Sequence, residues 1–139
     1  MATLDTNLYG FLSQAAGVGS VVSDGGSPET FRIFPVFAQE APTLPCLIYR
    51  TVSAIRNMTL DGPRGVVRER VQIDVIADTY TACRSLADAL RSALDGHSGT
   101  MGDVNVHYAH LQNQQDFYDG ESAFSRISMD FVITYEEGV

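Results

Sequence analysis

The 139-residue chain is long enough for one domain and short for two, so we expect a single domain over residues 1–139. Its net charge of −8, with arginine as the only basic residue apart from histidine, argues against binding nucleic acid through a basic patch and against docking on an anionic membrane. The charged fraction of 19%, below the usual value of about a quarter, indicates that other protein covers part of the surface, as in an oligomer.

The first predicted element is a short amphipathic helix near the N-terminus. Apolar residues recur there at spacings of three and four, and Gly17 follows as a stop: Leu4, Leu8, Phe11, Leu12 and Ala15. The next segment, residues 17–30, has the sequence GVGSVVSDGGSPET, and we expect a mobile connector that packs poorly.

A long β-hairpin is predicted in the middle of the chain. Pro35 confines residues 31–37 to a sheet edge or an irregular segment, and residues 40–45 extend this irregular run. A strand begins at Cys46, and a second strand alternates strictly from Val67 onward. The connection between them is longer than a tight turn, so its tip, residues 57–65, should protrude as an arm.

A second helix should follow the hairpin directly. Asp78 or Thr79 can cap its N-terminus and Gly96 can end it. We expect the buried stripe to consist of Ala82, Leu86, Ala89, Leu90, Ala93 and Leu94. The spacing of Arg84, Asp88 and Arg91 predicts ion pairs on the solvent face, from Arg84 to Asp88 and from Asp88 to Arg91.

The C-terminal part should add two more strands to the sheet. After a loop we expect a strand around residues 104–111, then a polar stretch, residues 113–120, and a last strand from Phe124 with strict alternation. The fold class predicted from this order is α+β. It is a mainly antiparallel sheet of four to five strands with two helices packed on one face and a long β-hairpin arm.

The sequence offers weak candidates for a metal site. His107 and His110 are the best ligands, with His97, Asp103 and Asp116 near them in sequence. Residues three apart on a strand point to opposite faces, which is poor ligand geometry, so we expect no metal.

Nucleophiles and paired carboxylates are equally weak. Cys46 and Cys83 form no CxxC motif and should be buried free thiols, and Ser98 beside His97 lacks an orienting acid. The glycine-rich segment lacks the lysine of a phosphate loop. Carboxylates on the polar faces of strands, at Asp74, Asp78 and Asp130, are best explained as solvated groups or partners of arginine. We therefore expect no catalytic residue and no cofactor.

Two arginines are the best candidates for contact with other protein. Arg68 and Arg70 flank Glu69 and should share one strand face. Arginine is enriched at protein interfaces, so carboxylates of a neighbouring chain are plausible partners for either side chain.

Nothing in the sequence indicates a membrane or secreted protein. No apolar run approaches the length of a membrane span, and the N-terminal MATLDTNLYG lacks the basic and apolar regions of a secretion signal. We expect the chain to fold in the cytoplasm.

The order of segments resembles the tail-completion, or tail-terminator, proteins of long-tailed bacteriophages. An N-terminal helix precedes a Gly-rich loop, and the other matching pieces are RIFPVFAQEAPTLPCLIYRTVS, RERVQIDVIADTYTACRSLADALRSAL and SRISMDFVITYEE. The resemblance implies a structural protein without an active site. Such proteins form a ring, typically a hexamer, that caps the head-proximal end of the tail tube and stops its polymerisation.

The resemblance also implies partners and a location. The partners would be further copies of the chain, the tail tube protein and the head–tail connector, with DNA passing through the lumen without specific binding. The location would be the virion tail, after assembly in the host cytoplasm. Candidate contact residues on and beside the arm are Asn57, Met58, Leu60, Arg64, Arg68 and Arg70.

Two alternatives remain open at the level of sequence. One is a neck or head-joining adaptor ring of similar fold that acts one layer higher. The other is a small dimeric α+β enzyme or ligand-binding domain, which would need a convergent cluster of polar residues between sheet and helices.

Overall fold

The computed structural model describes residues 4–15, 17–23, 31–36, 44–59, 62–102, 104–120 and 124–136. Its elements in chain order are α1 (Leu4–Gln14), α2 (Gly19–Val22), β1 (Ile33–Pro35), β2 (Cys46–Thr59), β3 (Gly62–Ala77), α3 (Tyr80–Leu94), β4 (Gly99–Met101), β5 (Val104–Asp119) and β6 (Phe124–Glu136). The predicted α+β class is confirmed.

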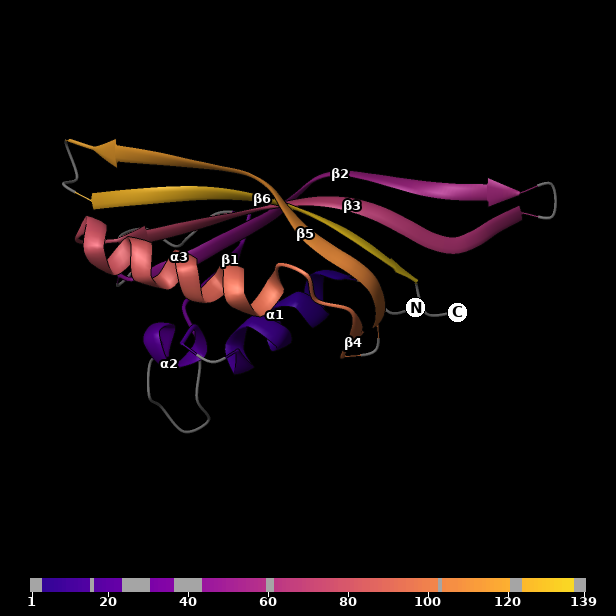
Figure 1. Ribbon diagram of the computed structural model, residues 1–139, viewed down its shortest axis with the longest axis horizontal. Helices are drawn as coiled ribbons and strands as arrows, with labels where there is room; N and C mark the ends of the chain where they lie inside the picture. The colour runs from indigo at the N-terminus through magenta and orange to yellow at the C-terminus, as the bar shows by residue number, and fades with distance from the viewer. Residues whose placement is uncertain are drawn as a thin grey trace.

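The strands form one sheet in the order β1-β2-β3-β6-β5-β4 (Figure 1). β1 runs parallel to β2, and the other neighbouring strands are antiparallel. The prediction of four to five mainly antiparallel strands was therefore wrong in number, because the described residues form six strands in a mixed sheet. The short edge strand β4 was missed because three residues beside glycines show no alternation. β1 lies at the other edge, as Pro35 indicated.

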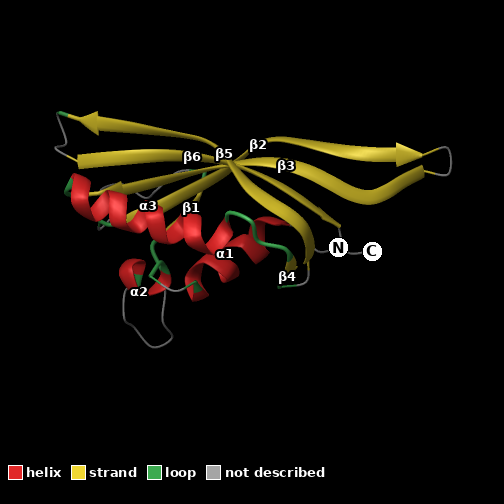
Figure 2. Cartoon of the chain, in the orientation of Figure 1, coloured by secondary structure: helices red, strands yellow, loops and turns green. Residues whose placement is uncertain are grey.

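The helices cover one face of the sheet, as predicted (Figure 2). α1 buries Leu4, Leu8 and Leu12 in the common core. Of the described helices, none is long and apolar enough to cross a membrane.

The connector after α1 is better packed than its composition indicated. Val18 and Val22 are completely buried, in or next to the single-turn helix α2. The expectation of a poorly packing segment is therefore wrong for residues 17–23, while residues 24–30 lie outside the described residues. Two valines among glycines and serines are too few to reveal helical periodicity, so only the tertiary contacts identify them as core.

Local sequence signals predict the ends of α3 correctly, but the buried face of the helix is rotated relative to the predicted one. Thr79 Oγ1 accepts a hydrogen bond from the Ala82 N–H at 3.2 Å, and Gly96 follows the helix with a φ of 84°, as expected of a cap and a stop. The buried residues are Cys83, Leu86, Ala87, Leu90 and Leu94. Ala82, which we expected inside, is exposed. The leucines define the stripe, and the alanines beside them are too small to fix its edge.

The ion pairs on α3 follow only partly the predicted spacing. Arg84 lies 3.4 Å from Asp88, as expected. Arg91 pairs with Asp95 at 3.6 Å, where we had expected Asp88. Asp95 is the residue after the helix, and its backbone N–H bonds to the Arg91 carbonyl oxygen, which brings the two side chains together.

β5 is much longer than predicted. It continues into residues 113–120, for which we expected only a polar stretch after the strand, and ends at Asp119. In this part β5 pairs with β6 from Asn113↔Asp130 to Asp119↔Phe124. Backbone pairing with a strongly apolar partner strand forms the strand where the side chains of β5 show no apolar alternation.

The centre of the sheet is the pair of β3 and β6, in register from Val66↔Glu136 to Ala77↔Ser125. The predicted inward face of β6 is confirmed: Ser125, Ile127, Met129, Phe131, Ile133 and Tyr135 are all buried. One carboxylate, Glu69, is also buried on this face. The Thr51 hydroxyl donates to Glu69 Oε2 at 2.6 Å and the Tyr135 hydroxyl donates to Oε1 at 2.8 Å.

Removing one of these donors should destabilise the fold. We expect Tyr135→Phe to lower the free energy of unfolding by about 1–3 kcal/mol, because a buried acceptor loses its partner. Urea denaturation measures the change. The matched control is Tyr118→Phe, at a side chain that is 69% exposed, which should stay within about 0.5 kcal/mol of the parent. Equal midpoints for the parent and Tyr135→Phe would contradict the role assigned to this hydroxyl.

Candidate functional site

The face of the sheet opposite the helices, called the open face below, carries a line of paired polar side chains. Arg126 forms an ion pair with Asp74, whose carboxylate is buried. Gln72 Nε2 donates to Asp74 Oδ1 at 3.1 Å, and Arg50 Nη2 donates to Gln72 Oε1 at 3.0 Å. This line of polar contacts thus joins the neighbouring strands β2, β3 and β6. It forms because alternate residues of the three strands share this face.

Among the residues of this line, we expect substitution of Asp74 to destabilise the fold most. It accepts from an arginine and a glutamine while buried. We expect Asp74→Asn to lower the free energy of unfolding by about 1–3 kcal/mol, because the charge-assisted bond to Arg126 is lost. Chemical denaturation checks this. Asp78→Asn is the matched control at an exposed carboxylate and should be nearly neutral; an equal effect of both would contradict the assignment.

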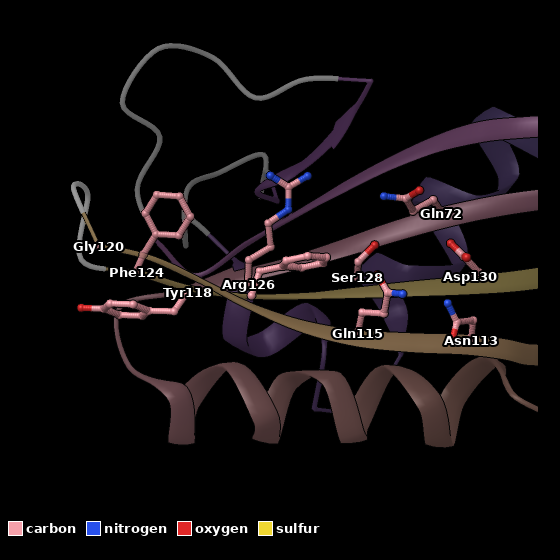
Figure 3. A pocket seen from close by; sticks show the side chains of 10 residues that line it. Gln72, Asn113, Gln115, Tyr118, Gly120, Phe124, Arg126, Ser128 and Asp130 are labelled. Atoms are coloured by element: carbon pink, nitrogen blue, oxygen red, sulfur yellow. The ribbon is translucent and has the colours of Figure 1, made fainter.

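A groove of about 720 Å³ lies on the open face, over the end of the sheet that is near the start of α3 (Figure 3). Its floor consists of amide and hydroxyl groups, among them Asn113, Gln115 and Ser128. Tyr118 and Phe124 stand at its outer end, and α3 lies below the sheet on the other face. Arg126 and Asp130, the charged residues that line it, are both paired within the chain.

This lining suits binding of a protein surface better than acid–base chemistry. Amides and hydroxyls donate and accept hydrogen bonds without changing charge near neutral pH, and exposed aromatic rings supply contact area. The alternative of an enzyme required a polar cluster between sheet and helices. The groove lies instead on the sheet face away from the helices.

The cysteines are buried thiols, as predicted. The Cys83 thiol donates to the carbonyl oxygens of Val75 and Ser125, at 3.2 and 3.5 Å. Burial raises the pKa of Cys46 and of Cys83 to about 11, from 9.0. Both thiols therefore remain protonated and poorly nucleophilic near neutral pH.

The thiols should react slowly in the folded protein. At about pH 8, a pKa raised by two units lowers the thiolate fraction by about 100-fold, and burial blocks access further. We expect iodoacetamide to alkylate the native chain at least about 100-fold more slowly than the guanidinium-unfolded chain. Mass spectrometry follows both rates. A cysteine that reacts equally fast in both states would contradict its burial.

The histidines lie in separate surroundings. His97 packs its ring against Phe11 at 4.7 Å, His107 Nε2 lies 3.6 Å from Glu136 Oε1, and the ring of His110 lies 5.8 Å from that of Tyr108. Within the described residues no three His, Cys, Asp or Glu side chains gather as metal ligands. Asp103 lies outside the described residues, so the expected lack of a metal stays a prediction.

The arm is the second feature of the candidate site. β3 pairs with β6 only as far as Val66, and beyond it β2 and β3 continue as a two-stranded hairpin. Figure 1 shows this hairpin reaching past the helices at one end of the long axis. On β2 the exposed run already begins at Thr51 and includes Val52 and Ile55, at 43% and 61% exposure.

Five of the six predicted contact residues lie in the strands of this hairpin, and Leu60 lies outside the described residues. Those in β2 are Asn57 and Met58, and those in β3 are Arg64, Arg68 and Arg70. The side chains of Asn57, Met58 and Arg64 are not described either. Arg68 and Arg70 share the open face, as predicted. Arg70 donates to Asp130 of its own chain at 3.1 Å. The contact of these residues with another chain stays a prediction.

Sequence reasoning missed the opposite end of the sheet. There Tyr80, Phe117 and Tyr118 are 51%, 52% and 69% exposed, and the Tyr80 hydroxyl donates to Asp116 Oδ2 at 3.2 Å. The available signal was the string DFYDGE at residues 116–121, with two aromatic and three acidic residues, most of it in the stretch that we described only as polar. Aromatic residues are enriched at protein interfaces, so exposed ones at the end of a sheet indicate a contact surface.

Comparison with known proteins adds a family and a fold. Residues 6–136 match the family model described as "Tail completion protein gp17". Among solved structures the chain is similar to one in "Virion of native gene transfer agent (GTA) particle", with a TM-score of 0.68, 15% sequence identity, and coverage of 96% of this chain and 94% of that chain. At this identity the likeness shows the fold alone. No curated protein matches the sequence.

Proposed function

The chain belongs to the family of tail completion proteins gp17, and from this membership we propose that it closes the head-proximal end of a phage tail tube. In this role it stops polymerisation of the tube and presents a surface to the head connector. The single observation that carries the proposal is the family match over residues 6–136. A fold shared over 96% of the chain with a chain of a virion particle supports it.

We propose that the chain acts as a single domain within a ring of identical copies, with a hexamer as the expected number. Two features favour such assembly. The helices cover only one face of the sheet, which leaves the open face for partners. The arm extends past the body, and at its base Ile55 is 61% exposed and available to a neighbour. A cap on a tube needs contacts with its own copies, with the tube protein below and with the connector above.

The candidate contact residues of the arm fit this role. Arg68 is exposed on the open face and lies opposite Ile55 in the pairing of β2 with β3. An exposed arginine beside an exposed isoleucine combines charge with apolar area, a pairing that is common at interfaces. We propose the same role for Arg70 and for the residues nearer the tip: Asn57, Met58, Leu60 and Arg64.

The net charge of −8 suits a ring through which DNA passes. Carboxylates that face the lumen would repel the phosphate backbone, so that DNA slides without being held. No enzymatic step is part of this proposal. The buried, protonated thiols and the amide-lined groove supply no nucleophile to the surface.

Deletion of the gene from the phage that carries it tests the function. We expect tails of irregular length that do not join to heads, because nothing stops the tube or completes its end. Electron microscopy measures tail length and joining, and a plasmid copy of the gene is the control. Tails of normal length that fail to join would indicate the neck adaptor instead. Normal, head-joined tails in the deletion would remove both roles.

A further inference from the structure

Charge is distributed unevenly along this acidic chain. Residues 50–70, which form most of the hairpin, hold five of the nine arginines but only two of the 17 acidic residues. This segment therefore carries a net charge of +3, and the rest of the chain carries −11. Arg68 has no acidic partner among the described residues. This basic segment runs from the body of the sheet into the hairpin, and Arg56 and Arg68 lie at the base of the hairpin, where β3 still pairs with β6.

The opposite end of the long axis has the complementary character. Figure 1 places the end of β5, the beginning of β6 and the start of α3 there, away from the arm. Asp78 and Asp116 are exposed at this end. The groove opens here, with the exposed rings of Phe117 and Tyr118 in its lining.

We propose that the arm of one copy docks in the groove end of the next copy, head to tail around the ring. Ile55 and Val52, at the base of the arm, pack against Phe117 and Tyr118, and Arg56 and Arg68 face Asp78 and Asp116. Two different surfaces that repeat in this way form a heterologous interface, which closes into a ring when the rotation between copies permits. The inference rests on the ring proposed above and names its lateral contact.

The physical match has three parts. Opposite charges steer the two surfaces together and fix their register, and like-charged pairings are penalised. Aromatic rings next to arginine add cation–π attraction. Residues 52–59, from the base of the arm to the last described residue of β2, span roughly 25 Å, which equals the width of about five strands at a spacing of about 4.8 Å.

Engineered cysteines test the contact directly. The double variant Ile55→Cys with Phe117→Cys cannot close a disulfide within one chain. Ile55 lies opposite Arg68 of β3, and Phe117 lies opposite Arg126 of β6, which in turn lies opposite Ile76 of β3. Arg68 and Ile76 are eight residues or roughly 26 Å apart along β3, whereas a disulfide needs Cα atoms within about 7 Å. Oxidised, purified phage particles should therefore yield a ladder of covalent oligomers on a non-reducing gel. The buried native thiols give little background.

The matched control uses Tyr108 in place of Phe117; Tyr108 is equally exposed at 51% but lies near the arm end of the sheet, three strand spacings or roughly 14 Å from Ile55 of the same chain. Ile55→Cys with Tyr108→Cys should give no ladder. Particles that contain the first double variant only as a monomer, or cross-linked to another protein, would overturn the inference while leaving the tail role intact. If the particles lack the chain, the tail role fails. In that case the purified double variant is oxidised at high concentration. The absence of covalent oligomers there would overturn the proposed contact as well.

Charge reversal gives a second measurement. Arg56→Glu with Arg68→Glu should reduce complementation of the deletion phage by at least about tenfold, as should Asp78→Arg with Asp116→Arg, because like charges then meet at every interface. All four changes in one chain should recover most of the loss. Arg84→Glu with Arg91→Glu, on the exposed face of α3, is the control and should complement like the parent. Reversals that remain additive in the fourfold variant would overturn the pairing.

Discussion

The antiparallel pairing of β3 with β6 is the constraint on which the other features depend. Its register, from Val66↔Glu136 to Ala77↔Ser125, sets which side chains of both strands face the helices. On that face it brings Tyr135 to the buried Glu69. On the other face it brings Arg126 to Asp74 and Asp130 to Arg70. A shift by one residue would exchange the two faces and break all of these contacts at once.

The same pairing defines where the body of the protein ends. β6 stops at Glu136, and the hairpin of β2 and β3 continues without it. Among the described residues, no third strand pairs with β2 or β3 beyond this point. The arm is therefore a consequence of unequal strand lengths. Since two-stranded hairpins are only marginally stable alone, we infer that contact with a partner would hold it in place.

The chemistry of the molecule is concentrated in contacts. Its thiols are buried, with pKa values raised to about 11. The charged residues of the groove, Arg126 and Asp130 on β6, form ion pairs with Asp74 and Arg70 on β3. Most of the large exposed apolar side chains lie in two groups: Val52, Ile55 and Tyr108 toward the arm, and Tyr80, Phe117 and Tyr118 at the other end of the sheet. The chain belongs to the tail completion family, and this distribution suits the capping role that we propose for it.

The sequence by itself determined the elements with regular alternation or helical spacing, and the family. The faces of β3 and β6, the buried cysteines and the shared face of Arg68 and Arg70 follow from local periodicity, while the sequence narrowed the helix cap to Asp78 or Thr79 and the structure decided for Thr79. Only the tertiary structure decided the rest, because those features depend on a partner strand or helix far away in sequence. β4 and the polar half of β5 exist through pairing with distant strands, and Val18 and Val22 are core through contacts beyond their own turn. The aromatic end of the sheet and its groove became visible when β5 and β6 were placed beside β3, since no local pattern encodes which strands become neighbours.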